Sequence, residues 1–381
     1  MACRRFQNER RTAPLEAPEE AALSFRLTRD LRKRLDRYIA DRVPQLSRAQ
    51  AQRLIEQERV RVNGSPAKAS LILKQGDLVE LQAPPPRSAN VEPEPVPLTV
   101  LHEDEAIIAL NKQPGVLVHP ARSNLHGTLV AGLLWRFREQ ASQGRGLSTI
   151  GQAFARPGVV HRLDRDTSGV ILFAKRDDAH GFLAQQFEQR TVEKRYIALV
   201  EGVVDPAADV VDAPIGPHPN RAKGYREKMV VRQDQLGKSA LTIYRALERF
   251  DGYSLVEVEL KTGRTHQIRV HMSHLGWPLV GDDMYGGSPL YETALRAPSG
   301  RWTEPGEGEK PLLARQALHA ATLTFTHPLT RRRLTLCAPF PEDMRRAVEA
   351  LRRHRPGAGR TGLSGASLDL DALLVAPARS S

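Results

Sequence analysis

A proline-rich stretch near residue 90 limits the ways in which this chain can fold. Residues 83–98 hold six prolines, and proline fixes its own backbone angle and donates no backbone hydrogen bond. Because neither a helix nor a central strand runs through such a stretch, we expect an extended, semi-rigid linker. The sequence therefore predicts two folded units, one before and one after the linker, at residues 23–82 and 99–354.

The two ends of the chain lack the periodic apolar pattern of a folded element. Residues 1–22 mix charged residues with alanine and proline, and residues 355–381 read RPGAGRTGLSGASLDLDALLVAPARSS. Segments of this kind bury too little apolar surface to offset the entropy of folding. Both are predicted to be disordered tails.

The first unit shows two helical patterns followed by short strands. In residues 31–43 the apolar positions recur every three or four residues, as on one face of a helix. Ser47 to Gln50 form a capping box, which predicts a second helix after it. Val60 to Val62 alternates and ends in Asn63-Gly64, a tight-turn signal. Two further strands are expected around Gly76, so the unit is predicted to be a small α/β domain.

Basic residues gather around the second predicted helix of this unit. Five of them are candidates for one cationic face: Arg48, Arg53, Arg59, Arg61 and Lys68. The whole chain holds 56 Lys and Arg against 44 Asp and Glu, a net charge of +12. Cations placed on phosphates release condensed counterions, so this charge favours a polyanionic partner. A solvated basic surface without any partner has the same composition.

Cysteine use and hydropathy argue against other classes of protein. The only cysteines are Cys3 and Cys337, too few for a disulfide framework or a zinc site, which fits a reducing cytosol. No apolar run has the length that a membrane helix needs. The N-terminal MACRRFQNERR also lacks the apolar core of a secretory signal. We expect a cytoplasmic protein without a membrane partner, and a monomer because no apolar patch is evident.

The second unit consists mainly of short strand patterns with fewer helices. Strands are predicted at 106–110, 170–174, 196–200, 255–260 and 323–326, and helices at about 127–139, 178–189, 265–275 and 341–353. Strands and helices do not alternate regularly along the chain. The pattern therefore favours an α+β domain built on a mixed, largely antiparallel sheet.

Residues 158–175, GVVHRLDRDTSGVILFAK, place a charged loop between two apolar runs. If these runs are strands, the loop is held at one end of the sheet. Asp164 lies between Arg162 and Arg165, and nearby positive charge lowers the pKa of a carboxylate. Such a group suits nucleophilic or electrostatic work. The alternative is a salt-bridged turn in which Asp166 caps the backbone; we favour it for Asp166, and for Asp164 both readings stay open.

Five segments, in order along the chain, resemble the large-subunit-rRNA class of pseudouridine synthases. They are LNKQPGVLVHP (110–120), GVVHRLDRDTSG (158–169), EKRYIALVEG (193–202), KTGRTHQIRVHMSHLGWPLVGDDMYGG (261–287) and RQALHAATLTFTHP (315–328). In front of them, SRAQAQRLIEQERVRVNG (47–64) resembles the alpha-L RNA-binding domain. Together the resemblance covers about residues 23–351. It implies the pseudouridine synthase fold preceded by a small RNA-binding domain.

The resemblance also implies a reaction and a set of residue roles. These enzymes break the bond between uracil N1 and the ribose, turn the base and rejoin it through C5, which needs neither cofactor nor metal. It implies that Asp164 acts on the sugar and that Arg162 enters the space left by the flipped base. It further implies that Tyr196 packs against the uracil and that Arg264 holds the carboxylate of Asp164 with its guanidinium fork.

Each of these roles has a structural alternative. Tyr196 lies in a strand-like run and is as easily a core aromatic, and Arg264 is as easily a surface residue at a helix start. His161, His266 and His271 suggest a metal site at first sight. We do not expect one, because no carboxylate-rich set accompanies them and the neighbouring arginines repel a dication.

The resemblance implies RNA as the partner, either large-subunit rRNA or a pre-ribosomal large subunit. PQLSRAQ, RVNG, VHPARSNLHGTLV and APIGPHP favour the subtype that modifies a stem-loop at the subunit interface. A pseudouridine synthase acting on tRNA and a non-catalytic RNA-binding assembly factor remain as alternatives. A base-excising glycosidase would share the carboxylate, but it needs an activated water and no general base stands beside the site.

Overall fold

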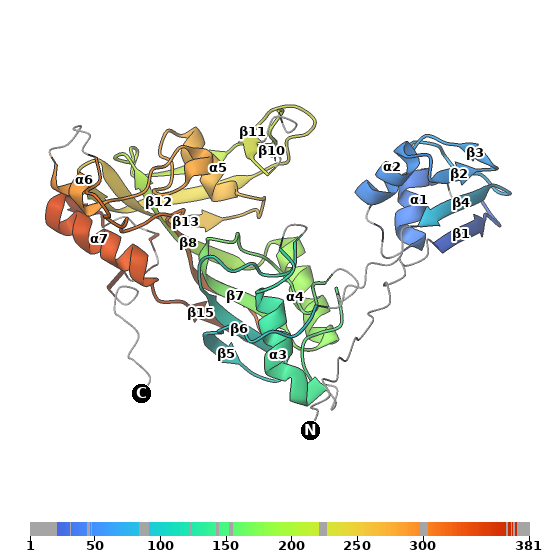
Figure 1. Ribbon diagram of the computed structural model, residues 1–381, viewed down its shortest axis with the longest axis horizontal. Helices are drawn as coiled ribbons and strands as arrows, with labels where there is room; N and C mark the ends of the chain where they lie inside the picture. Colours follow the sequence, from blue (N-terminus) through green and yellow to red (C-terminus); the bar gives the residue numbers. More distant parts are fainter. Residues whose placement is uncertain are drawn as a thin grey trace, which may run out of the picture. The chain divides into compact units, whose positions relative to one another are not determined.

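The chain folds into two compact units, divided between Ala89 and Asn90, inside the predicted linker (Figure 1). The computed structural model describes residues 21–30, 32–43, 46, 48–83, 91–121, 124–141, 145–151, 155–220, 227–297, 304–362, 365, 366, 368, 370 and 371. No helix in these ranges is both long and apolar enough to cross a membrane.

The small unit packs two helices against a four-stranded sheet. Its elements are β1 (Ala21–Arg26), α1 (Leu35–Arg42), α2 (Arg48–Glu56), β2 (Val60–Val62), β3 (Ser65–Pro66) and β4 (Leu78–Ala83), with strand order β1-β4-β2-β3. The predicted inward positions that the structure describes are buried, among them Leu35, Ile39 and Leu54; Leu31, the first predicted position, lies outside the described residues. Of the two strands expected around Gly76, only the second forms; Ile72 makes an isolated bridge to Arg34 instead.

The large unit is built on a ten-stranded sheet that is antiparallel except where β14 runs parallel to β7. Its strands are β5 (Val100–Glu103), β6 (Ile107–Lys112), β7 (Ser168–Ala174), β8 (Glu193–Glu201), β9 (Ala208–Asp212), β12 (Leu241–Phe250), β13 (Tyr253–Leu260), β14 (Leu318–Thr326), β15 (Arg333–Cys337) and β16 (Pro356–Arg360). Their order is β16-β12-β13-β8-β14-β7-β6-β5, with β15 beside β14 and β9 beside β12. The predicted α+β class and mixed, largely antiparallel sheet are confirmed.

Helices cover both faces of this sheet. They are α3 (Leu129–Ala141), α4 (Asp177–Gln189), α5 (Gln267–His274), α6 (Glu292–Arg296) and α7 (Glu342–His354), with a short 3-10 helix, η3 (Asp283–Tyr285), and a separate hairpin of β10 (Ile215–Pro217) and β11 (Met229–Val231). Alternate residues of β8 point to opposite faces: Tyr196 joins the core that includes α3 and α5 residues, and Ile197 joins the core under α7. We call the face of Tyr196 the front face.

The C-terminal residues depart from the predicted disordered tail. Residues 356–360 form β16, which pairs with β12, and Leu370 is buried. The backbone of β16 pairs with β12, while most of its side chains stay exposed. The segment therefore needs no apolar periodicity to form a strand. A Cβ at Gly357 would lie 2.6 Å from the carbonyl oxygen of Arg249, so only glycine fits there.

The linker and the N-terminal tail also end earlier than predicted. β1 already begins at Ala21. Residues 91–98 were expected in a semi-rigid linker, and they lie against α3 and the residues before it: the N–H of Glu94 donates to the carbonyl oxygen of Ala131 at 3.1 Å, and a Glu94 carboxylate oxygen accepts the N–H of Gly127 at 2.6 Å. The side chain of Val96 occupies the space over Gly132, where a Cβ would approach it to 2.8 Å. Proline therefore sets the extended backbone of this stretch, and its apolar residues still find a surface to cover.

Candidate active site

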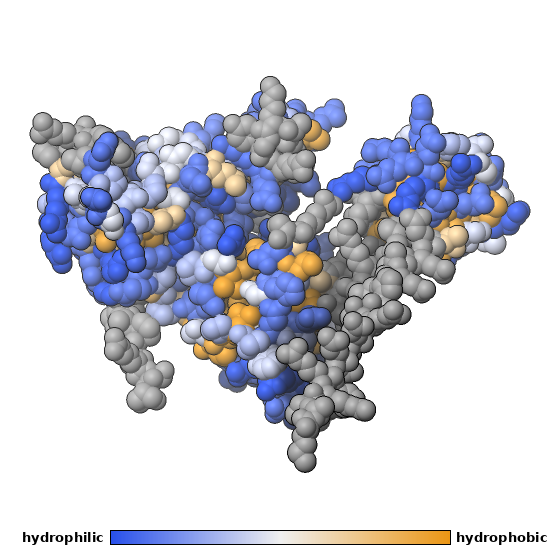
Figure 2. All heavy atoms as spheres, viewed as in Figure 1, coloured by the Kyte–Doolittle hydropathy of each residue, from blue (hydrophilic) through white to orange (hydrophobic). Residues whose placement is uncertain are grey.

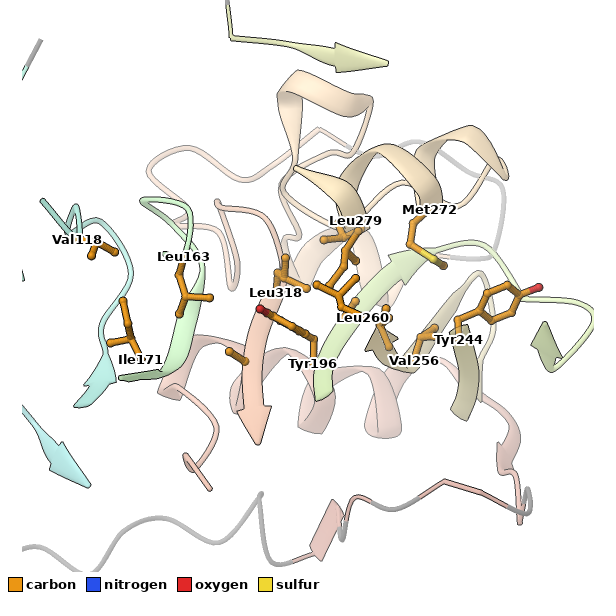
Figure 3. Packing of buried hydrophobic residues seen from close by; sticks show 14 of the residues in the cluster. Val118, Leu163, Ile171, Tyr196, Tyr244, Val256, Leu260, Met272, Leu279 and Leu318 are labelled. Carbon is orange, nitrogen blue, oxygen red and sulfur yellow. The ribbon is translucent and has the colours of Figure 1, made fainter. Parts of the chain in front are cut away.

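A cavity of about 440 Å³ opens on the front face of the large unit. Four parts of the chain line it: the loop around Asp164, the stretch from the end of α4 to Tyr196 in β8, residues 260–269 before and within α5, and Leu318 of β14. Figure 3 shows the hydroxyl of Tyr196 beside Leu318, on the side that faces Leu163. The expected strand before the loop is only an isolated bridge from Val159 to Phe173.

Asp164 reaches this cavity with few short contacts. Its side chain is 19% exposed, and one carboxylate oxygen lies 3.5 Å from Nη1 of Arg269 and 3.7 Å from Nε2 of His266. In the described part of the chain, neither of the arginines beside it in sequence, Arg162 and Arg165, forms an ion pair with it. Arg165 donates through Nε to the carbonyl oxygen of Gly115. The cation nearest to Asp164 among the described residues therefore comes from α5.

Arg269 is the arginine that the structure brings to Asp164. Its Nε and Nη2 donate to the two carboxylate oxygens of Asp282 at 2.6 and 2.7 Å, and both side chains are buried. Its guanidinium also lies over the ring of Tyr285, 4.9 Å from the centroid. The fork is therefore held by Asp282, and only Nη1 is turned toward Asp164.

Arg264, predicted to hold Asp164, does not do so. Its Nε donates to the carbonyl oxygen of Ser239 at 3.0 Å, and its backbone N–H donates to Oε1 of Gln267. It lines the cavity but makes no ion pair with Asp164 among the residues described. Arg269 lies in the same quoted motif, but its position in the sequence alone did not distinguish it from Arg264.

His266 turns its Nε2 toward Asp164, at 3.7 Å. Its other ring nitrogen, Nδ1, shares a hydrogen bond of 2.9 Å with the hydroxyl of Tyr285, which also accepts the backbone N–H of Met229. Burial lowers the pKa of His266, although the charge of Asp164 opposes this. The ring is therefore held between Tyr285 and Asp164 at the cavity wall.

Tyr196 is an almost buried aromatic side chain at the cavity wall, only 8% exposed. Burial raises the pKa of its phenol well above the usual range, and the charge of Asp164 raises it further. The phenol therefore stays protonated. It offers the cavity a flat apolar ring and one hydroxyl.

Two residues that the sequence analysis did not single out hold the loop of Asp164. The fully buried Lys112 donates from Nζ to the carbonyl oxygens of Gln113, Arg165 and Thr167 at 3.0, 2.6 and 2.8 Å. Burial lowers the pKa of Lys112 to about 7, while the charge of Asp166 opposes the shift. Arg315 donates from Nη1 to the carbonyl oxygen of Asp166 at 2.9 Å. Both residues lie inside the motifs quoted above, so the sequence offered a signal for each.

The histidines of the motifs are engaged within the protein. Nε2 of His161 accepts the backbone N–H of Leu172, and His271 contacts Thr242 and the carbonyl oxygen of Ala213. Elsewhere, His102, Asp104 and His327 place three potential ligand atoms close together.

That histidine–aspartate group is better described as a hydrogen-bonded cluster than as a metal site. Nδ1 of His327 accepts the N–H groups of Leu329 and Thr330, so its proton is on Nε2, which donates to Asp104 at 2.8 Å. A metal would have to displace that proton, and none of the three residues lines the cavity.

In the small unit the structure places the predicted basic residues at the surface. Arg48, Arg53, Arg61 and Lys68 are exposed and Arg59 is half-buried. Nε of Arg48 donates to Asp36, which also holds the unpredicted Arg34 through two hydrogen bonds. Hydrophilic residues cover most of the visible face of this unit in Figure 2.

Comparisons with known proteins agree with one another. Residues 106–274 match the family model described as RNA pseudouridylate synthase, and residues 33–79 match the S4 domain. An uncharacterized RNA pseudouridine synthase of Bacillus subtilis, YlyB, is 40% identical over 322 residues, which cover 84% of this chain and 95% of that protein. The ribosomal large subunit pseudouridine synthase D of Xanthomonas campestris pv. campestris is 39% identical over 320 residues, 84% of this chain and 89% of the relative. The solved structure of human RNA pseudouridylate synthase domain containing 1 superposes with a TM-score of 0.50 at 26% identity, covering 74% of this chain and 94% of that one.

Proposed function

Since the chain belongs to the RNA pseudouridine synthase family and carries an S4 domain, we propose that it converts uridines of large-subunit ribosomal RNA to pseudouridine, with Asp164 as the catalytic carboxylate. Relatives named ribosomal large subunit pseudouridine synthase D, at 39% identity, support this choice of RNA. The substrate is the rRNA itself or a pre-ribosomal large subunit. We further propose that the protein acts as a cytoplasmic monomer, as the sequence predicts.

One observation supports the role of Asp164 above the others. Its carboxylate faces the cavity with contacts of 3.5 and 3.7 Å only, among the residues described. Oxygens that are not used up by short hydrogen bonds are free to approach the anomeric carbon of a ribose. The cationic Arg269, fixed by Asp282, keeps the carboxylate in an electrostatically favourable place.

The remaining residues have roles that follow from their places around the cavity. The target uridine must leave its stack before its reacting atoms become accessible. The flipped uracil would then pack on the ring of Tyr196. Arg162 is exposed and lines the cavity, so it is placed to fill the gap that the base leaves in the RNA.

The chemistry balances without any outside reagent. The bond from N1 to C1′ breaks, the bond from C5 to C1′ forms, C5 loses a proton and N1 ends with one. The oxidation state does not change, so the protein needs only to hold the ribose, turn the base and move a proton. Asp164, Tyr196 and His266 are among the titratable side chains that line the cavity.

The test is to replace Asp164 by asparagine in the full-length protein. Asp164→Asn keeps the shape of the side chain but removes the negative oxygen, so pseudouridine formation on large-subunit rRNA should fall below detection. RNA binding should stay within about threefold, because binding depends on the cations. Asp166→Asn, two residues away, is the matched control and should remain active.

Pseudouridine mapping across rRNA and tRNA, from cells with and without the protein, then identifies the substrate. Loss of modified sites from tRNA alone would contradict the proposed rRNA target. Release of free uracil would indicate a glycosidase, and turnover of Asp164→Asn near that of the wild type would refute the catalytic role of this carboxylate.

A further inference from the structure

Two lysines of the catalytic unit are withdrawn from solvent, and their amines have opposite surroundings. Lys112 satisfies all three donors of its ammonium group with carbonyl oxygens. Lys194 is half-buried, yet within the described ranges its amine makes no hydrogen bond and no ion pair. Burial lowers the pKa of Lys194, and the charge of Arg190 lowers it further. Partly burying an ammonium that has no partner costs stability, so folding alone does not explain this arrangement.

Lys194 lies on the wall of the active-site cavity. It precedes Tyr196 by two residues in β8, so both side chains point to the front face. Its Nζ lies beside Gly263, where an added Cβ would be 3.8 Å away. Glycine at this position leaves the space around the amine open to the cavity, which both residues line.

The part of the cavity wall around Lys194 is positively charged. Arg190, the left-handed C-cap residue of α4, lines the cavity next to it. The acidic liner near this end, Glu188, is exposed and forms no ion pair with Lys194 in the described part of the chain. In contrast, the charge of Arg269 at the other end is matched by Asp282. An anion therefore fits the cavity at the Lys194 end.

We propose that Lys194, with Arg190 beside it, binds the phosphodiester on one side of the flipped target uridine. This inference rests on the proposed function and names a contact that the reaction needs. When the uracil is detached and turns, only the sugar and its two phosphates still tie the nucleotide to the RNA. A phosphate held by Lys194 keeps the ribose in place at Asp164 during that step, and lysine binds phosphate as a point charge.

The experiment pairs a protein change with a substrate change, so that each reports on the other. Full-length wild type and Lys194→Met act on RNA stem-loops whose linkage 5′ or 3′ to the target uridine is a neutral methylphosphonate. For the wild type, one neutral linkage should lower kcat/KM by about tenfold to a hundredfold. Lys194→Met should show a similar loss on the normal RNA and no further loss with that linkage.

Two control variants separate a phosphate contact from a general effect of charge. Lys310→Met removes an exposed lysine of the same unit and should stay as sensitive to the neutral linkage as the wild type. Lys194→Arg should recover most of the activity. The log–log salt dependence of binding should become shallower by about 0.7 to 0.9 for Lys194→Met, as expected for one lost phosphate contact.

The possible outcomes are distinct. If the wild type is indifferent to both neutral linkages, or if the losses for Lys194→Met and the linkages simply add, Lys194 holds neither phosphate. The wild-type measurement decides the question even if Lys194→Met fails to fold. If the wild type forms pseudouridine on no RNA at all, the proposed function fails, which is a different result from an active enzyme that ignores its flanking phosphates.

Discussion

A carboxylate among arginines occurs in both units, with opposite surroundings. In the small unit Asp36 is fully buried and accepts five hydrogen bonds, from Arg34, the backbone of Arg37, Arg48 and Gln52. In the catalytic unit Asp164 is partly exposed, and its nearest cation among the described residues is 3.5 Å away. The difference arises because Arg269 uses Nε and Nη2 of its guanidinium to bind Asp282, and only Nη1 is left to face Asp164. A saturated carboxylate organises its neighbours, whereas an unsaturated one beside a fixed cation can still react.

The strongest test of this comparison changes the arginine that Asp282 fixes. Arg269→Lys keeps the charge but cannot hold two carboxylates with one ammonium. Because Arg269 lines the cavity beside Asp164, we expect kcat/KM to fall by about a hundredfold, which corresponds to about 2.7 kcal/mol of transition-state stabilisation. Arg264→Lys is the matched control within the same motif and should stay within about threefold of the wild type. If Arg264→Lys were the damaging change, Asp164 would depend on a different arginine from the one seen here.

A second test asks whether Asp36 is structural. In Asp36→Asn the amide nitrogen faces the donors of Arg34 or Arg48, so the small unit should lose about 2 kcal/mol of unfolding free energy. Asp41→Asn, in an exposed pair with Lys33, should cost less than about 1 kcal/mol. Hydrogen exchange of residues 35–56 reports the small unit, and the tryptophans, at 135, 277 and 302, report the large one.

The same pair of variants also tests whether the small unit binds RNA. Asp36→Asn frees Arg34 and Arg48 from their fixed positions, so RNA affinity should weaken more than for Asp41→Asn. Equal affinity and equal salt dependence for the two variants would show that Asp36 does not organise an RNA-binding surface.

The smallest expected effect is a difference between the two units in how their stability depends on pH. All twelve histidines lie between residues 102 and 354, and residues 21–83 contain none. Burial lowers the pKa of His319 to about 4, so between pH 6.5 and 5 the unfolded chain takes up a proton that the folded one does not. The free energy of unfolding therefore decreases as the pH is lowered from 6.5 to 5, by about 1.5 kcal/mol for this residue. Urea unfolding followed by tryptophan fluorescence should show the loss, and His319→Gln should reduce the pH slope by about one proton.

The small unit, which contains no histidine among residues 21–83, is the internal control and is measured in the same samples. Its hydrogen exchange should stay nearly constant over this pH range once the intrinsic exchange rate is taken into account. A wild-type pH slope equal to that of His319→Gln would mean that His319 is not the proton-linked group.

Elements with a strong periodic pattern were predictable from the sequence. The helix expected at 178–189 is α4 at Asp177–Gln189, and the one at 341–353 is α7 at Glu342–His354. β12 was not predicted, because its register shifts between Ala246 and Glu248 and interrupts the alternation of side chains. β16 was not predicted for a related reason, since its residues contribute backbone hydrogen bonds and little apolar surface.

The sequence predicted which motif residues line the cavity, but not which residues distant in sequence they contact. Asp164 and Tyr196 both line the cavity, as expected. The choice between Arg264 and Arg269 depends on where α5 begins and on Asp282, thirteen residues beyond Arg269. The amine of Lys112 reaches carbonyl oxygens 53 and 55 residues away. A local motif can mark such a residue, but it does not say which distant group the residue contacts.

The parallel pairing of β7 with β14 also determines the order in which parts of the protein can fold during translation. Ser168, just after the loop of Asp164, contacts His319, which the ribosome adds 151 residues later. Next to it, Gly169 fits so tightly against Ala320 that a Cβ would come within 2.2 Å of its carbonyl oxygen. A nascent chain thus completes its S4 domain first, and the loop of Asp164 gains this support only after residues 319 and 320 have been made. The chain gains the means to hold RNA long before it can modify any.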